Sequence, residues 1–307
     1  MVDSNTAETH WELSKDDSQM LLDRLFPDEV IFGPISMGEL FIKNQRNYFL
    51  MEQVFKNLVD KGLYNEQEQH WSGAPDLSAM AATAQEGPLV NFFNSVIKCI
   101  NDACGTVRPG SLWQLLVATV LEIVRKLDMS CWLTPGSKLD WRHLATFAEV
   151  KNCGGKANEK SSYIEMAGKV SCLLYAQDGH HAAPCFHILG SSIHLTIFDH
   201  GGSLSTCGYD INSKTHDFIC ILISVTSTPH EILSFNTLIT WVWQQCNGKT
   251  VGVKALNVWV GDTELAIELD RVLFISDNLF SRGTMVWGGM IRDTQTRTRE
   301  PVVMKDS

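Results

Sequence analysis

Apolar residues recur at helical spacing in the first third of the chain. This spacing predicts helices over residues 16–26, 44–62 and 88–103, each with one apolar face. Gly, Ser, Pro, Ala and Gln dominate between residues 67 and 87, and this composition predicts a linker. The apolar stretch 111–124 fits a helix or a strand, because its periodicity favours neither. The N-terminal part is therefore expected to be mainly helical.

The pattern changes to short apolar runs after residue 125, which is typical of strands. Strands are predicted over residues 126–132, 145–151, 185–189 and 192–199. A polar loop over 152–160 and a helix over 161–177, with Ser161 as its N-cap, separate the second and third of them. The order strand, strand, helix, strand, strand predicts a mixed α/β domain with a central sheet.

Charged residues interrupt the apolar pattern on the first two of these strands. Side chains alternate along a strand, so Glu149 and Lys151 share one face. If the two strands form a hairpin, Asp128 joins them, and two carboxylates and one lysine converge. The alternative interpretation is an edge strand with a solvated face and an incidental ion pair.

This pattern resembles the PD-(D/E)xK nuclease superfamily, with its restriction-endonuclease-like fold. In that superfamily an Asp on one strand and an E-x-K on the next hold a divalent metal. The resemblance implies that Asp128 and Glu149 bind Mg²⁺, that Lys151 positions the attacking water or the developing anion, and that Gln177 supports them. Leu127 stands where the superfamily often has Pro, which affects backbone stiffness and not the metal ligands.

Composition limits the class of protein. The chain has 307 residues, of which 44% are hydrophobic and 20% charged, as in ordinary globular domains. It has no apolar run of membrane-spanning length and no signal peptide, so we expect an intracellular protein, cytoplasmic or nuclear, with no membrane association. Nine cysteines without a C-x-x-C pair predict neither a zinc site nor disulfides, and no disulfide-linked partner.

Charge bears on the nuclease hypothesis. The formal net charge is -10, which argues against non-specific binding to nucleic acid, because phosphate contacts need Lys and Arg. Residues 1–70 hold much of the acidic excess, whereas the stretch 122–178 is close to balanced. Net charge therefore weakens the hypothesis without excluding it.

Several short motifs in a fixed order resemble the fungal-type protein kinase family over roughly residues 85–307. They are Leu139–Arg142, Glu149–Lys151, Gln177, Ile197–Gly202, Tyr209–Asn212, Phe280–Trp287 and Pro301–Ser307. The sequence departs from the family pattern where His180, His200 and Ser281 stand in place of arginines and of the first glycine of the nucleotide loop. These departures weaken a catalytic role.

The C-terminal motifs imply the first strands of a kinase small lobe. Gly283 matches the loop that covers the ATP phosphates, and Lys305 matches the lysine that reaches them. The αC glutamate, the H-R-D loop and the D-F-G motif are missing from these residues. We therefore expect a truncated kinase domain that retains only a remnant of the ATP site and does not bind ATP productively.

The sequence thus predicts an α/β protein in three parts. Residues 1–74 form a helical N-terminal region and linker, 75–270 a restriction-endonuclease-like mixed sheet flanked by helices, and 271–307 an incomplete kinase small lobe. Two functions remain open. The favoured one is a non-catalytic module that binds a nucleic acid or protein partner, or regulates; the other is Mg²⁺-dependent phosphodiester hydrolysis.

Overall fold

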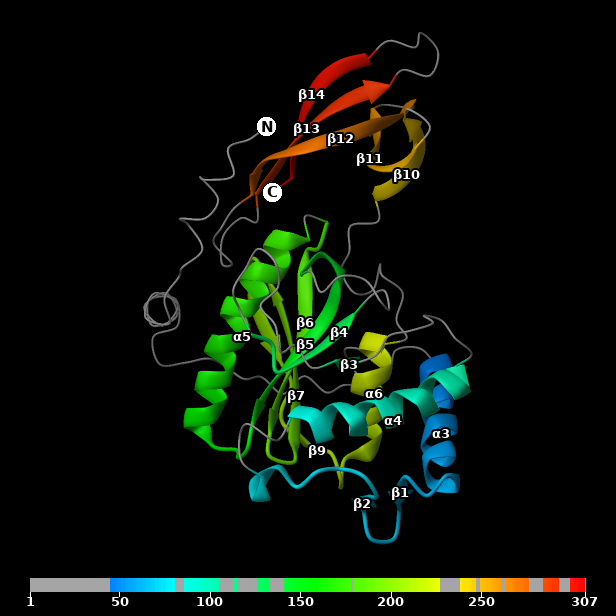
Figure 1. Cartoon of the computed structure of the whole chain (residues 1–307), viewed down its shortest axis with the longest axis vertical. Coiled ribbons are helices and arrows are strands. Elements are labelled where there is room, and N and C mark those ends of the chain that lie inside the picture. Colours follow the sequence, from blue (N-terminus) through cyan, green and yellow to red (C-terminus); the bar gives the residue numbers. More distant parts are fainter. Residues whose placement is uncertain are drawn as a thin grey trace. The chain divides into compact units, whose positions relative to one another are not determined.

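The computed structural model describes residues 45–80, 86–104, 113–114, 126–132, 141–177, 179–226, 238–246, 249–260, 263–275, 284–292 and 299–306 (Figure 1). The predicted helix over 16–26 and most of the ambiguous stretch 111–124 lie outside these residues. Contacts divide the chain into two compact units. The first holds the described residues up to Leu173, with Pro184–Phe198 and Ser203–Thr226; the second holds Leu174–Ala183, Asp199–Gly202 and the described residues after 230.

A mixed sheet forms the centre of the first unit. Its main strands run in the order β3-β4-β5-β6-β7-β8, and β9 pairs with β7. The bounds are β3 (Trp113–Gln114), β4 (Met129–Trp132), β5 (Leu144–Lys151), β6 (Ala182–Leu189), β7 (Ser192–Asp199), β8 (Gly202–Ser205) and β9 (Tyr209–Asp210). Strands β4 and β5 pair antiparallel, which confirms the predicted hairpin, and β5 pairs with β6 in parallel. The mixed α/β class is therefore confirmed.

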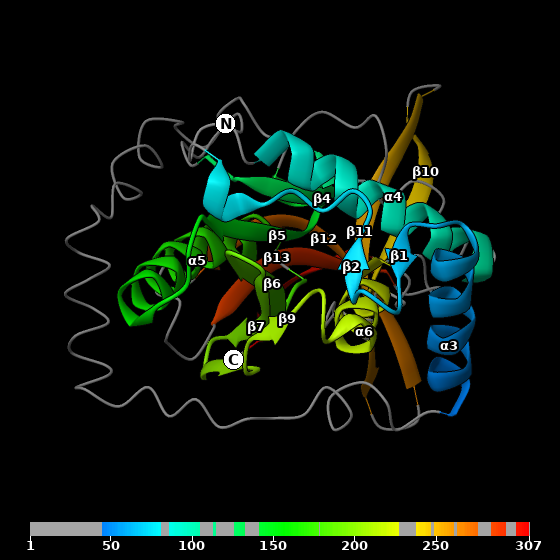
Figure 2. The same cartoon turned by 90° about the horizontal axis from the view of Figure 1, so that it is seen from below.

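Helices cover both faces of this sheet (Figures 1 and 2). They are α3 (Gln45–Asp60), α4 (Glu86–Cys104), α5 (Lys156–Ala176) and α6 (Thr215–Thr226). One face, with Ala148, Val150 and Ile188, joins a large apolar core with α3, α4 and α6. The other face meets α5, where the ring of Tyr163 lies 5.2 Å from that of Phe198. Glu149 and Lys151 lie on this second face, as the alternation along β5 requires.

Helix α5 begins earlier than the sequence pattern indicated. The predicted polar loop over 152–160 is wrong in its second half, because the helix starts at Lys156. The stretch Lys156–Lys160 contains Lys, Ala and Glu, which favour helix, and only the glycines before it stop the helix. Ser161 is therefore inside the helix, where its hydroxyl donates to Glu165 Oε1 (3.3 Å) instead of capping the N-terminus.

The predicted linker over 67–87 is folded onto the core in part. It contains β2 (His70–Trp71), which pairs with β1 (Tyr64–Asn65), and a short 3₁₀ turn over Leu77–Ala79. Trp71 is fully buried, and its indole N–H donates to the Ile211 carbonyl (2.7 Å). The sequence pattern did not predict the packing of Trp71, because turn-forming residues surround it and a single buried tryptophan produces no periodic pattern. The domain division expected after residue 74 consequently falls within one apolar core.

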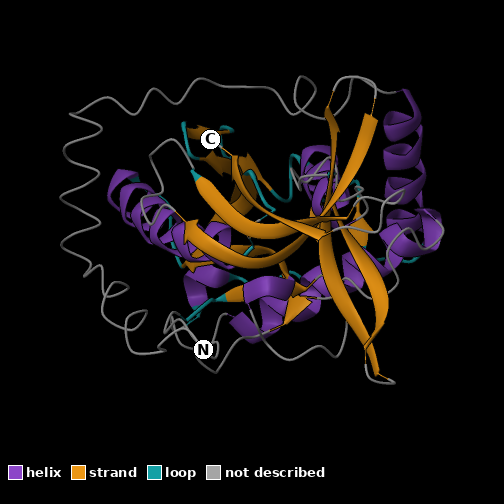
Figure 3. Cartoon of the chain, turned by 90° about the horizontal axis from the view of Figure 1, so that it is seen from above, coloured by secondary structure: helices purple, strands orange, loops and turns teal. Residues whose placement is uncertain are grey.

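The second unit contains an antiparallel sheet (Figure 3). Its strands follow one another in chain order. They are β10 (Ile239–Cys246), β11 (Lys249–Val260), β12 (Thr263–Ile275), β13 (Met285–Arg292) and β14 (Arg299–Asp306). One face carries a small core formed by Leu256, Ile267, Leu269, Met285 and Trp287. The division expected after residue 270 falls inside β12, so the kinase-like strands β13 and β14 continue a sheet that starts at Ile239.

Glycine is required at position 289, where β13 lies against β12. A Cβ atom added at Gly289 would stand 2.6 Å from the Glu268 carbonyl oxygen, which is closer than real Cβ contacts allow. Gly289 pairs with Leu269 immediately before an irregularity in β12. Gly289 therefore serves strand packing here.

None of the described helices combines the length and apolar character that a membrane span requires.

Candidate functional site

The β4–β5 hairpin brings three of the predicted site residues together. Asp128 immediately precedes β4, and its Oδ2 accepts a hydrogen bond from the backbone N–H of Val150 (2.9 Å). Glu149 and Lys151 flank Val150 on β5. Asp128 is thus fixed against the strand that carries the E-x-K motif.

Both oxygens of the Glu149 carboxylate are engaged by lysines. Lys151 Nζ donates to Oε1 at 3.0 Å, and Lys169 Nζ, from α5, forms a short ion pair with Oε2. Glu149 is 2% exposed and Lys169 8% exposed, so this contact is inside the protein. A carboxylate in such a place needs partners, because burying an unpaired charge is costly.

A second glutamate from α5 completes the arrangement. Glu165 Oε2 accepts from Lys151 Nζ at 3.0 Å. We name Asp128, Glu149, Lys151, Glu165 and Lys169 the charge cluster. It has three carboxylates and two ammonium groups, and it lies between the β4–β5 hairpin and α5.

Burial and neighbouring charges shift the pKa values of Lys151 and Glu165. Burial by itself lowers the pKa of Lys151, but the Glu149 and Glu165 carboxylates outweigh it, and the net pKa is raised. Burial raises the pKa of Glu165, and the adjacent Glu149 carboxylate raises it further, against the opposing effect of Lys151. Lys151 therefore remains an ammonium at neutral pH.

The sequence pattern singled out neither Glu165 nor Lys169. The signal was present in the spacing of Ser161, Glu165 and Lys169, which are four residues apart. Residues at this spacing share one face of a helix. A polar stripe on a helix that covers a sheet indicates a polar partner on that sheet, and here the partner is Glu149.

The cluster as arranged does not fit Mg²⁺. Magnesium needs carboxylate oxygens that are free to coordinate, and it keeps several of its waters. Both Glu149 oxygens accept from ammonium groups, and Asp128 Oδ2 accepts from a backbone N–H. Among the described residues, no group of three or more His, Cys, Asp or Glu is placed to hold a metal ion.

Two histidines lie beside the cluster on the sheet. The parallel register of β5 and β6 places His187 opposite Glu149. His187 is 1% exposed, and its ring centroid lies 4.2 Å from that of His194 on β7. Neither ring nitrogen of His187 has a hydrogen-bond partner in the described part of the chain. Burial, with a smaller effect of His194, lowers the pKa of His187 to about 3, so its ring is neutral at physiological pH.

The remaining predicted site residues belong to the second unit or lie outside the described residues. Gln177 follows α5 directly and is buried. The backbone carbonyl of Gln177 accepts a hydrogen bond from the backbone N–H of His180 (2.9 Å). Lys305 is exposed on β14, opposite Val286 on β13. Gly283 lies outside the described residues.

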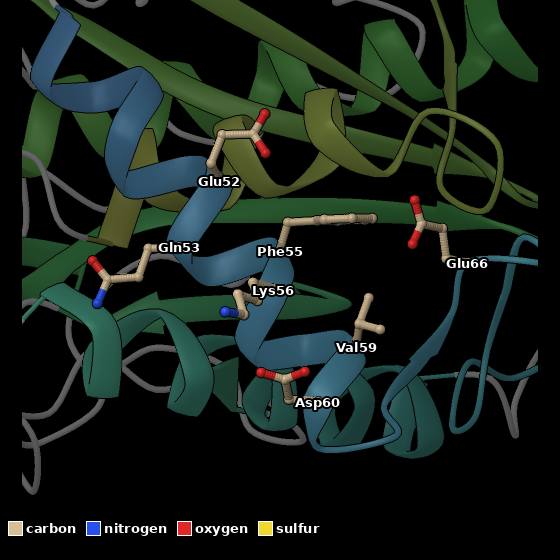
Figure 4. Close-up of a pocket in the computed structure, with 7 residues that line it drawn as sticks. All are labelled: Glu52, Gln53, Phe55, Lys56, Val59, Asp60 and Glu66. Atoms are coloured by element: carbon tan, nitrogen blue, oxygen red, sulfur yellow. The ribbon is translucent and has the colours of Figure 1, made fainter.

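A separate cavity of about 480 Å³ lies on α3 in the first unit. Figure 4 shows Phe55 and Val59 projecting from α3 beside carboxylates. The lining residues are Glu52, Gln53, Phe55, Lys56, Val59, Asp60 and Glu66. None of the predicted site residues lines this cavity.

One family model, described as Fungal protein kinase, matches residues 127–307, which is more than half of the chain. The match starts next to Asp128, and it includes both the β4–β5 hairpin and the sheet of the second unit. No curated protein and no solved structure gives a significant match. The chain therefore belongs to the fungal protein kinase family.

Proposed function

We propose that the α/β domain around the charge cluster is a non-catalytic module that binds a partner, or regulates, in the service of the kinase part of this family. The observation that carries the proposal is the pairing of Glu149. This residue is buried, and each of its two carboxylate oxygens is held by a lysine. An E-x-K motif in this state stabilises the junction of sheet and helix. It leaves Glu149 no oxygen without a lysine partner with which to coordinate a metal ion.

The family match supports a role beside a kinase. The same match covers the hairpin with the charge cluster and the strands with Lys305, so the two parts occur together in the family. The proposal assigns no phosphoryl transfer to residues 1–307 alone, because this sequence contains neither an H-R-D catalytic loop nor a D-F-G metal ligand. Gly283 and Lys305 are proposed as a remnant of the nucleotide site.

A second candidate function is Mg²⁺-dependent phosphodiester hydrolysis by Asp128, Glu149 and Lys151, with support from Gln177. The observation that favours it is the position of Asp128 against the E-x-K strand, as the resemblance to the restriction-endonuclease-like fold implied. For this function Lys169 would have to leave Glu149. The surface would also need a basic track for the phosphate backbone, and the net charge is -10.

A cleavage assay decides between the two candidates. The full chain is incubated with single- and double-stranded DNA and RNA in Mg²⁺ and in Mn²⁺, beside a Glu149→Gln variant that keeps the shape of the side chain. We expect wild type and variant to give the same background cleavage, because lysines already occupy the oxygens of Glu149 that a metal ion would need. Cleavage by the wild type that the variant lacks would contradict the non-catalytic proposal and establish the second candidate.

A further inference from the structure

The cavity on α3, which we name the α3 cavity, differs from the charge cluster in the pairing of its carboxylates. Glu52, Asp60 and Glu66 line it together with one lysine, Lys56, so the formal charge of the lining is -2. Within the described ranges, no ion pair joins any of these carboxylates to a lysine or an arginine, and Glu52 lies 3.7 Å from His216 Nε2. The acidic lining therefore has room for a cation from another molecule.

The base of the α3 cavity is apolar and includes an aromatic ring. Phe55 and Val59 are four residues apart and share one face of α3. The side chain of Phe55 extends between the carboxylates of Glu52 and Glu66 (Figure 4). The Phe55 ring stacks on the ring of His216, with centroids 4.3 Å apart and an interplanar angle of 28°. An aromatic ring next to carboxylates attracts a cation that can also contact apolar surface.

The chemistry of this lining favours an arginine side chain. A guanidinium group is planar, stacks on aromatic rings and donates pairs of hydrogen bonds to carboxylates, while its aliphatic stem covers apolar surface. The cavity volume of about 480 Å³ lies within the usual range of ligand pockets, about 300–1,000 Å³. A metal ion fits less well, because among the described residues no group of three His, Cys, Asp or Glu is placed to hold one.

We propose that the α3 cavity binds an arginine side chain from a basic segment of a partner protein. The inference rests on the proposed function, a module that binds a partner, and it names the chemistry of that partner. Charge complementarity supports it, because residues 1–70 hold much of the acidic excess of a chain with net charge -10. The lining residues all precede residues 127–307, which the family model matches, so this surface is additional to the matched part.

Peptide binding to the full chain tests the inference. Fluorescein-labelled hexa-arginine and hexa-lysine are titrated with the protein, and fluorescence anisotropy gives the two affinities. An ionic strength of about 0.15 M screens long-range attraction between exposed charges. We expect the wild type to bind hexa-arginine about three-fold more tightly than hexa-lysine, because guanidinium stacks on Phe55. Glu52→Gln/Glu66→Gln should weaken hexa-arginine binding about ten-fold, because two charge-assisted hydrogen-bond acceptors are lost.

Two controls make the result specific to the cavity. Glu68→Gln/Glu300→Gln removes the same number of charges at exposed positions outside the cavity, and it should bind as the wild type does. Phe55→Leu keeps an apolar side chain and removes the aromatic ring, so it should bind the two peptides with equal affinity.

The contrary outcomes leave the proposed function separate from this inference. Equal weakening by the cavity pair and the control pair would overturn the inference, because net charge alone would then attract the peptide. No binding of hexa-arginine by the wild type, or equal affinity for both peptides, would also overturn it. A wild type that self-associates in sedimentation, with a monomeric Glu52→Gln/Glu66→Gln variant, would assign the cavity to a second copy of this chain instead. None of these results bears on the cleavage assay, which tests the non-catalytic proposal through Glu149.

Discussion

Glu149→Leu should lower the free energy of unfolding of the first unit by about 3–5 kcal/mol, the usual cost of removing one partner of a buried ion pair. The variant leaves the Lys169 ammonium buried without its carboxylate, and Lys151 loses one of the two carboxylate partners that the described residues give it. Chemical denaturation of wild type and variant at neutral pH measures the loss. It is the largest single-site effect that we expect from the charge cluster.

The double variant Glu149→Leu/Lys169→Met should recover most of that loss, because two apolar side chains replace a buried ion pair at little cost. The coupling between the two positions is read from the cycle of single and double variants. The exposed pair of Lys61 and Asp102, joined at 2.8 Å, is the matched surface control, and its removal should change stability far less. Additive losses at Glu149 and Lys169 would contradict the account, because they would mean that the two charges do not depend on each other.

Stability should fall as the pH is lowered, with a contribution from His187 of about 1.4 kcal/mol per pH unit between pH 6.5 and 3. The pKa of His187 is lowered from 6.5 to about 3 in the folded protein, so in this window the unfolded chain binds the proton more readily. Protonation therefore favours unfolding, and the total contribution reaches about 5 kcal/mol at the lower limit. The neighbouring groups are His194, whose pKa burial also lowers, and Glu149 in register on β5.

Denaturation curves at a series of pH values, for the wild type and for His187→Leu, isolate this contribution. The variant should have a flatter pH profile, while the exposed His70→Gln should keep that of the wild type. Other acidic groups titrate in all three proteins, so the difference between the profiles is the quantity to compare. Equal slopes for wild type and His187→Leu would show that His187 is not held neutral in the folded protein.

The part of the site that the sequence could predict is the part with short-range patterns. The period of two along Ala145–Lys151 places Glu149 and Lys151 on one face, and two neighbouring apolar runs indicate the hairpin that brings Asp128 beside them. The mixed sheet follows from the order of strands and helix. These features depend on residues that are close in the sequence, so short-range sequence patterns are enough to predict them.

The rest depends on packing between distant segments. That Lys169 meets Glu149 depends on the rotation of α5 over the sheet, and no local preference determines that rotation. His187 lies next to Glu149 only because β6 joins β5 in parallel in one particular register. Trp71 is buried against Phe92 and Phe218, and the Ile211 carbonyl, 140 residues later, accepts its N–H. The spacing of Glu165 and Lys169 indicates a polar helix face but not its partner on the sheet, and the sequence contains no periodic signal for the other two contacts.

The most direct test of the closed charge cluster is calorimetric titration of Mg²⁺ and Mn²⁺ into the wild-type protein. The same titration of Lys169→Met/Glu149→Leu, which has no Glu149 carboxylate, gives the baseline. The account predicts that the two proteins give the same heats, because the lysines already occupy both oxygens of Glu149. Saturable binding by the wild type that is missing in the double variant would contradict it and make Asp128 and Glu149 a working metal site.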